Sequence, residues 1–425
     1  MFATRSVTLP LLCLGLYGLG CGKTAPVPEP DPKEASSPPG QNVQPSNLTL
    51  QKPKSVKNST IDQYLGQLAA PRTAQGVWIQ SSTQLLANHQ GTVPLPAASI
   101  TKVATSLAAL KKLGPHHRFS TVIGATGPIK DGVLQGDLVI QGGADPLFVW
   151  EDAIATANLL SQKGIQRVSG NLIIQGPFYM NFRTDPQQTG ELLKQGFNAQ
   201  QWPPEAATQY QTLKDIPKPQ LEIQGNVQIA EAVTQSTGIH EHPSLPLAEL
   251  LKRMNRYSNN AMAEMLAQEV GGAQVVAQIA AQAAGVPQSE VQLINGSGLG
   301  VENRMSPRAA CGIMLAISNL LHPQQMTLAD ILAIPGKDIG ILDSRPLPQQ
   351  AILKSGTLNR VSALAGAIST QKQDAVWFVL LNGEGNIALF RSQQETLLQT
   401  LIAEWEAAAE IPLSLKSTPL SHQRR

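Results

Sequence analysis

Residues 96–110 of this chain read PAASITKVATSLAAL, and Gly114-Pro115 follows shortly after. Apolar and small residues recur at spacings of three and four, so the stretch predicts a helix that begins near its first residue and ends before the Gly-Pro pair. Ser99 and Lys102 are three residues apart and therefore share one face of this helix. The sequence thus places an amine beside a hydroxyl in the first turn.

Such a pair can carry out nucleophilic chemistry. A serine hydroxyl is a weak nucleophile, and a partly desolvated lysine can lose its proton and act as the base that activates it. The first amides of a helix lack intrahelical partners, so the Ser99 N–H could donate to an oxyanion. The same spacing recurs at Ser369 and Lys372, in a polar segment between two apolar runs that predicts a hairpin turn. The motif alone therefore does not identify a site.

The composition argues against some classes of function. The 425 residues carry a formal net charge of +2, and 15% of them are charged, with Lys and Arg spread along the chain. No basic patch marks a nucleic-acid partner. A chain of this length can bury a large core, and we expect two domains and a tail.

The first residues predict export. Arg5 precedes an apolar run that is too short for a stable membrane anchor but typical of a signal peptide, which we assign to residues 1–20. The sequence GLGC at residues 18–21 resembles the cleavage box of bacterial lipoproteins, with glycine where an aliphatic residue is usual. Lipid attachment at Cys21 is left open by these residues.

Shifts in composition divide the rest of the chain. After the signal peptide the chain turns to Pro, Ser, Gln and Asn, which cannot bury enough apolar surface to fold. We expect a disordered linker over 21–57, the first part of a main domain over 58–118, an inserted smaller α+β domain over 119–225, the rest of the main domain over 226–412, and a disordered tail over 413–425.

Several elements of the main domain are expected from periodicity. Residues 76–87 predict a hairpin, the apolar runs 352–368 and 375–381 each predict a strand, and residues 387–409 predict a long amphipathic helix. In the inserted part, residues 185–219 are rich in Gln and Pro with little periodicity, so no element is predicted there.

Two further motifs follow in chain order. Ser258 and Asn260 form a Ser-x-Asn pattern at a break between two apolar helical segments, where polar side chains can face a cleft. Residues 354–357, KSGT, lie on a predicted strand. Helix capping is an alternative explanation for Ser258 and Asn260, and an edge strand with a glycine bulge is one for 354–357.

In this order and context, the three motifs resemble those of the penicillin-recognising serine acyl-transferases. The chain resembles in particular the D-alanyl-D-alanine carboxypeptidase/endopeptidase family, the low-molecular-mass class C penicillin-binding proteins. Further matching segments are GDL at 136–138, GGADP at 142–146, GNL at 170–172, NGSGL at 295–299 and NRMSP at 303–307. The resemblance covers residues 60–405 and implies an α+β fold, a β-lactamase/transpeptidase-like domain whose antiparallel sheet is flanked by helices, with the inserted domain.

The resemblance implies catalytic roles. Ser99 would attack the carbonyl of the penultimate D-alanine, Lys102 would take its proton, and Ser258 would pass a proton to the leaving amine. The amides of Ser99 and Thr357 would form the oxyanion hole. Asn260 would keep Lys102 oriented.

It also implies a substrate-binding set. Asn260 would hold the amide carbonyl of the substrate, and Lys354 would supply the positive field for its terminal carboxylate. The hydroxyls of Ser355 and Thr357 would donate to that carboxylate, and Gly356 completes the Lys-Ser-Gly motif. The NGSGL segment is expected to shape a wall near the cleft.

The implied activity is that of a serine D-Ala-D-Ala carboxypeptidase, with endopeptidase action open, in the periplasm or cell envelope. Its partners would be peptidoglycan stem peptides ending in D-Ala-D-Ala and β-lactams as inhibitors, with the membrane involved only through a lipid at Cys21. No cofactor or metal is expected, since the loop over 240–242, HEH, has no third ligand nearby. Cys311 is expected to be buried. A serine β-lactamase and a noncatalytic cell-wall binding protein are the alternatives.

Overall fold

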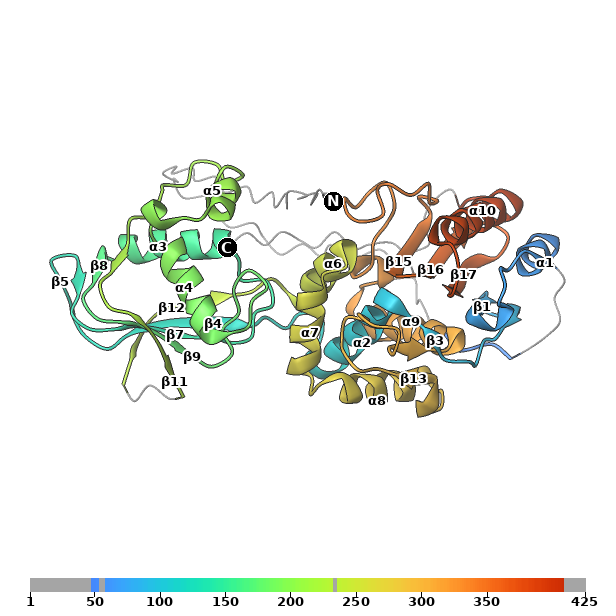
Figure 1. Ribbon diagram of the computed structural model, residues 1–425, viewed down its shortest axis with the longest axis horizontal. Helices are drawn as coiled ribbons and strands as arrows, with labels where there is room; N and C mark the ends of the chain where they lie inside the picture. The colour runs from blue at the N-terminus through green and yellow to red at the C-terminus, as the bar shows by residue number, and fades with distance from the viewer. Residues whose placement is uncertain (1–46, 53–57, 232–234, 409–425) are drawn as a thin grey trace, which may run out of the picture. The chain divides into compact units, whose positions relative to one another are not determined.

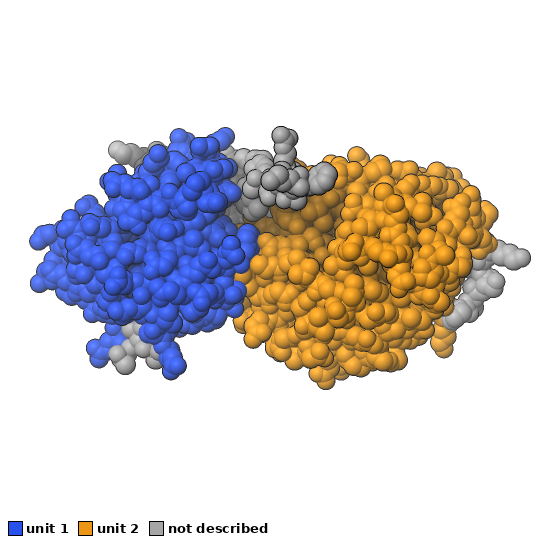
Figure 2. All heavy atoms as spheres, in the orientation of Figure 1, with its two compact units in different colours: residues 1–44, 122–142, 148–242 blue, residues 45–121, 143–147, 243–425 orange. Residues whose placement is uncertain are grey.

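The computed structural model describes residues 47–52, 58–231 and 235–408. The predicted signal peptide, Cys21, most of the predicted linker and the predicted tail lie outside these residues. The chain divides into two compact units, coloured separately in Figure 2. Unit 1 comprises the described residues of Val122–Gly142 and Phe148–His242, and unit 2 those of Pro45–Thr121, Gly143–Leu147 and Pro243–Arg425.

Unit 2 is built on a five-stranded antiparallel sheet of order β15-β16-β17-β1-β2 (Figure 1). Its strands are β1 (Gln75–Gln80), β2 (Leu85–His89), β15 (Ala351–Leu358), β16 (Val361–Thr370) and β17 (Asp374–Asn382). The predicted hairpin over 76–87 is confirmed as β1 and β2. The single strand predicted over 352–368 is wrong, because a turn at Asn359-Arg360 folds this run into β15 and β16. Arg360 has a φ of 61°, the left-handed conformation that tight hairpin turns require.

Both faces of this sheet are covered by helices. Along β17, Val376, Phe378 and Leu380 join the core that includes α1 (Ser59–Gly66) and α10 (Ile387–Trp405). The alternate residues, such as Trp377, point to the opposite face and are equally buried. There α9 (Pro307–Leu321) packs against β1, β16 and β17. A sheet buried on both faces agrees with the predicted α+β architecture.

The helix predicted from residues 96–110 is the central element of unit 2. It is α2 (Thr101–Leu113), surrounded by α9, α6 (Leu247–Tyr257), α7 (Asn260–Glu269) and α8 (Ala273–Ala284). Residues 101–110 are all buried, and the alanines among them let these neighbours approach closely. The helix begins later than predicted, after β3 (Leu95–Pro96) and the 3₁₀ turn η2 (Ala98–Ile100), because Ala98 takes a left-handed φ of 46°.

The remaining short elements of unit 2 are β13 (Val291–Gln292) and β14 (Arg304–Met305), which form a three-stranded sheet with β3, and the 3₁₀ turns η1 (Arg72–Ala74), η4 (Gln288–Glu290), η5 (His322–Gln324) and η6 (Leu328–Asp330). Cys311 on α9 is fully buried and free, as expected. Among the helices that the structure describes, none is both long enough and apolar enough to cross a bilayer.

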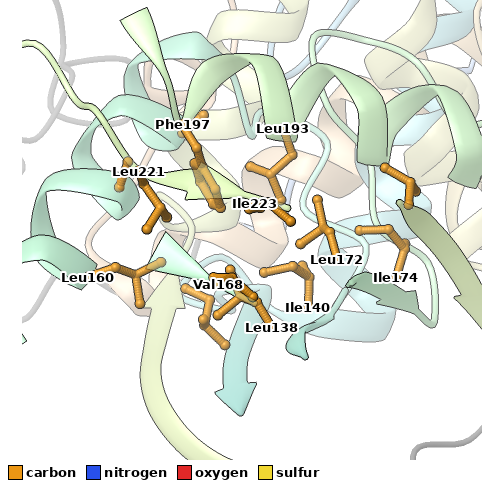
Figure 3. Packing of buried hydrophobic residues seen from close by; sticks show 14 of the residues in the cluster. Leu138, Ile140, Leu160, Val168, Leu172, Ile174, Leu193, Phe197, Leu221 and Ile223 are labelled. Atoms are coloured by element: carbon orange, nitrogen blue, oxygen red, sulfur yellow. The ribbon is translucent and has the colours of Figure 1, made fainter. Parts of the chain in front are cut away.

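Unit 1 contains a mixed five-stranded sheet of order β11-β9-β7-β4-β12 and a four-stranded sheet of order β10-β8-β6-β5. The strands are β4 (Ser120–Ala125), β5 (Ile129–Lys130), β6 (Val133–Leu134), β7 (Leu138–Gln141), β8 (Arg167–Val168), β9 (Leu172–Gln175), β10 (Glu222–Ile223), β11 (Val227–Ala230) and β12 (Thr237–Pro243). Its helices are α3 (Trp150–Gln162), α4 (Pro186–Gly196) and α5 (Pro204–Tyr210), with the 3₁₀ turn η3 (Ala199–Gln201). Figure 3 shows Leu138 and Leu172 from the sheet beside Leu193 and Phe197, in the core of this unit.

Two features of unit 1 differ from the sequence analysis. The stretch over 185–219, for which no element was predicted, contains α4 and α5. Asp185 caps α4 by accepting from the N–H of Gln188, and Pro186 stands at its first turn, a capped start that favours a helix although few of its residues are apolar. The compact unit continues to His242 rather than 225, because β11 and β12 complete its sheet. The other domain boundaries stay predictions.

Candidate active site

The amine of Lys102 joins three parts of unit 2. Its Nζ donates to Ser99 Oγ at 3.0 Å, to Asn260 Oδ1 at 2.7 Å and to the carbonyl of Ser297 at 2.6 Å. Three acceptors satisfy an ammonium group fully. A neutral amine keeps two N–H donors and one lone pair, and because Asn260 Oδ1 and the Ser297 carbonyl can only accept, the lone pair would face Ser99 Oγ. The geometry therefore suits transfer of a proton from Ser99 to Lys102.

The burial of Lys102 makes this transfer feasible near neutral pH. The side chain is fully buried, and desolvation of its ammonium form lowers the pKa of Lys102 to about 7, with the negative charge of Glu264 opposing the shift. Burial also holds the pKa of Lys354 well below its usual value, and the nearby charge of Lys102 adds to this effect. A charged Lys102 thus disfavours protonation of Lys354.

Ser258 lies at the predicted break between α6 and α7. It ends α6 in a left-handed conformation with φ 52° and ψ 40°. The side chain that caps α7 belongs to Asn259, which accepts from the N–H of Met262 at 3.0 Å. Helix capping therefore does not occupy the side chain of Ser258 or that of Asn260. Instead Ser258 Oγ accepts from Lys354 Nζ at 2.9 Å, and the same amine donates to the Ser355 carbonyl at 2.8 Å.

β15 is an edge strand, and its free edge meets the Ser99 turn. A Cβ on Gly356 would lie only 2.8 Å from the Ser99 nitrogen and 3.0 Å from the Ala97 carbonyl oxygen. Glycine is therefore required for this close backbone approach. The register between β15 and β16 is continuous from Ala351 to Leu358, so the alternative of a glycine bulge is wrong.

Two backbone amides come together at this contact. The Leu353 N–H donates away from β16, to the Ala333 carbonyl at 2.9 Å. Every second residue along a strand has the same orientation, so the N–H of Thr357, four residues after Leu353, points to the same free edge. The first hydrogen bond of η2 runs from the Ile100 N–H to the Ala97 carbonyl. The Ser99 N–H lies one residue before it, among the first amides of the turn, which lack partners within the turn. Amides of Ser99 and Thr357 thus line the place where an oxyanion hole was predicted.

The second Ser-x-x-Lys match has no such surroundings. Ser369 is buried near the end of β16, and Lys372 lies in the turn before β17, as predicted. Lys372 is exposed and pairs with Glu406 at 2.8 Å. In the HEH segment, His242 lies 3.4 Å from Asp152, and the described residues contain no group of three or more potential metal ligands.

Two contributions to the site were not predicted from the sequence. The Ser297 carbonyl is the third acceptor of Lys102, and Glu264 holds it in place by accepting from the N–H groups of Gly296 at 2.9 Å and Ser297 at 3.0 Å. Glu264 stands one helical turn after Asn260, a spacing that could have indicated it. The segment predicted to be a wall thus also supplies a hydrogen-bond acceptor.

Unit 2 has a sheet covered by helices on both faces, with serine, lysine and asparagine side chains clustered at the start of its central helix. This arrangement defines the class of β-lactamase/transpeptidase-like α+β hydrolases. The chain belongs to the D-Ala-D-Ala carboxypeptidase 3 (S13) family, which matches it over residues 57–212 and 207–406. It is a serine D-Ala-D-Ala carboxypeptidase-type hydrolase, and the family resemblance, fold class and enzyme class inferred from the sequence are confirmed.

Named relatives agree with this assignment. The D-alanyl-D-alanine carboxypeptidase DacB of Haemophilus influenzae is 22% identical over 403 residues, covering 71% of this chain and 84% of that protein. The carboxypeptidase DacB of Mycolicibacterium smegmatis is 30% identical over 166 residues, covering 34% of this chain and 35% of that protein.

Solved structures share the fold. The penicillin G-acylated predatory endopeptidase Bd3459 of Bdellovibrio bacteriovorus, in complex with immunity protein Bd3460, has a TM-score of 0.69 at 22% identity, covering 81% of this chain and 96% of that one. Penicillin binding protein 4 (dacB) of H. influenzae has a TM-score of 0.61 at 19% identity, covering 83% and 100%. At these identities the likeness supports the fold.

Proposed function

We propose that this chain trims peptidoglycan stem peptides ending in D-Ala-D-Ala through an acyl-enzyme on Ser99. The observation that carries the proposal is the hydrogen bonding of Lys102, whose two other acceptors direct its lone pair to Ser99 Oγ. The lowered pKa of about 7 leaves much of this amine neutral at physiological pH. A buried lysine base beside a serine is a nucleophile–base pair.

In the acylation step, Ser99 Oγ attacks the carbonyl of the penultimate D-alanine while its proton moves to Lys102. The negative charge that develops on the carbonyl oxygen accepts hydrogen bonds from the amides of Ser99 and Thr357, each contributing about 3 kcal/mol. The tetrahedral intermediate then collapses and the amide C–N bond breaks. Ser258 gives its proton to the leaving D-alanine amine, and the proton that Lys102 took from Ser99 replaces it on Ser258, so both groups end acylation neutral. The contact from Lys354 Nζ to Ser258 Oγ orients this hydroxyl.

Water completes the cycle: neutral Lys102 takes a proton from the water that attacks the ester carbonyl, the bond from the acyl carbon to Ser99 Oγ breaks, and Lys102 passes that proton to Ser99 Oγ as the shortened peptide leaves. Asn260 would hold the substrate amide, and Ser355 and Thr357 would donate to its terminal carboxylate. Where the leaving amine belongs to a second peptide strand, the same steps give endopeptidase cleavage. β-Lactams would acylate Ser99 because they resemble the D-Ala-D-Ala end, and the penicillin-acylated form of the structural relative Bd3459 supports this.

The location follows from the substrate. A stem-peptide hydrolase works outside the cytoplasm, and the predicted signal peptide over 1–20 and the linker over 21–57 support export to the periplasm or cell envelope. A lipid on Cys21 would tether the chain to a membrane through that linker. We also propose that unit 1 is a domain inserted into the transpeptidase-like domain.

Labelling with penicillin tests the proposal. The purified mature chain is incubated with a fluorescent penicillin, and the acylated residue is located by peptide mass spectrometry. We expect one adduct per chain on Ser99, its loss in Ser99→Ala, and full labelling of the control Ser369→Ala, whose hydroxyl has no hydrogen-bond partner. Absence of an adduct on Ser99 would leave the noncatalytic wall-binding alternative. Rapid turnover of penicillin without release of D-alanine from peptides would favour a β-lactamase.

A further inference from the structure

A second cation lies beside the proposed site, on α10. Arg391 Nη2 donates to the hydroxyl of Thr357 at 2.9 Å. Thr357 directly follows Gly356, whose backbone touches the Ser99 turn. The exposed Thr357 hydroxyl uses a lone pair to accept from Arg391, so its own hydrogen stays available to donate to a ligand.

Arg391 has no ion-pair partner in the part of the chain that the structure describes. Its neighbour Arg345 holds Glu395 at 2.7 Å. The Nε of Arg391 is buried and has no hydrogen-bond partner. A buried N–H is out of reach of a ligand, but the Nη2 group of Arg391 meets Thr357 at an exposed contact, and a guanidinium prefers a carboxylate as its acceptor.

Lys354 is less suited to this task than the sequence implied. Its side chain is 1% exposed, and its amine is engaged by Ser258 Oγ and the Ser355 carbonyl. Arg391 is only partly buried, and a guanidinium remains charged at every physiological pH. Lys354 therefore lies inside the site, and Arg391 lies at its rim.

We propose that Arg391, together with the Thr357 hydroxyl, binds the carboxylate of the amino acid that leaves during acylation. This inference rests on the proposed function and deepens it, because it assigns the cation that makes the site select peptides with a free carboxylate next to the scissile bond. Arg391 is a substrate-binding residue in this scheme and takes no part in proton transfer.

The test uses two acyl-D-alanyl thioesters that differ in one group: the leaving thiol is thioglycolate, with a free carboxylate, or its methyl ester. We expect Arg391→Ala to lower kcat/KM for the thioglycolate about ten- to hundredfold, the usual loss for a charged hydrogen bond, and to leave the methyl ester within about twofold of wild type. Arg391→Lys, which keeps the charge but not the planar fork, should recover part of the loss.

Arg360→Ala is the matched control. It removes the same charge from the turn after β15, where the guanidinium of Arg360 donates to the Glu384 carbonyl, and it should change neither substrate. Equal losses for both thioesters in Arg391→Ala would mean that Arg391 only supports β15, and no loss would mean that it does not bind substrate. Either result overturns this inference alone if wild type forms the Ser99 adduct. A wild type with no adduct overturns the proposed function as well.

Discussion

Asn260→Asp places a negative charge against the proposed base without changing the shape of the side chain. Asn260 Oδ1 lies 2.7 Å from Lys102 Nζ. At an effective dielectric constant of about 20, a unit charge at that distance attracts an ammonium by about 6 kcal/mol. Desolvation of the new carboxylate offsets part of this attraction. Because about 1.4 kcal/mol changes a pKa by one pH unit, we expect the pKa of Lys102 to rise by about two to three pH units.

The sign of the effect follows from the role of the amine. Acylation needs neutral Lys102, so the wild-type rate should rise with pH through the pKa of about 7. In Asn260→Asp this rise should move to higher pH. At pH 7 the acylation rate should fall about hundredfold or more, and it should recover as the pH approaches 10.

The assay is the second-order rate constant for acylation by a fluorescent penicillin between pH 5 and pH 10. Asn259→Asp is the matched control, because it adds the same charge one residue away, at a helix cap where aspartate is well accepted. A rate in Asn260→Asp that drops by one factor at every pH, with an unmoved midpoint, would refute the assignment of Lys102 as the base.

Three further substitutions test the packing around the site. Gly356→Ala should slow penicillin acylation about hundredfold, because its Cβ displaces the Ser99 turn, and a rate equal to wild type would contradict this. Gly298→Ala should lower the melting temperature more than Gly285→Ala. Both glycines have a positive φ, but only a Cβ at Gly298 would meet a carbonyl oxygen, at 1.9 Å. Equal decreases in melting temperature would refute this clash. Leu401→Ala should cost about 2–5 kcal/mol in urea unfolding, and a loss below about 1 kcal/mol would mean that α10 is loosely packed.

Much of the candidate site could be proposed from the sequence because its signals are local. The spacing of Ser99 and Lys102 depends only on helical geometry, and the break at Ser258 is visible as an interruption of helical periodicity. These motifs, with their order along the chain, were sufficient for the family and the fold class. The same logic recognised the segment around Lys372 as a turn rather than a site.

Prediction failed where local signals were weak. The run over 352–368 is buried on both faces of the sheet, so it lacks the polar alternation that would have marked β15 and β16, and its turn contains no glycine. In unit 1, α4 is rich in Gln and has few apolar residues, and α5 has only seven residues. The extent of unit 1 also depends on strand pairing between segments distant in sequence.

The amino-acid sequence by itself determined which residues could do chemistry and the family to which the chain belongs. Only the tertiary structure decided how these residues are positioned relative to one another. A backbone carbonyl is the same at every position, so no sequence pattern marks that of Ser297 as the third acceptor of Lys102. Neither the burial that lowers the pKa of Lys102 nor the contact from Arg391 to Thr357 is encoded locally. Both arise because packing brings together segments that are far apart along the chain.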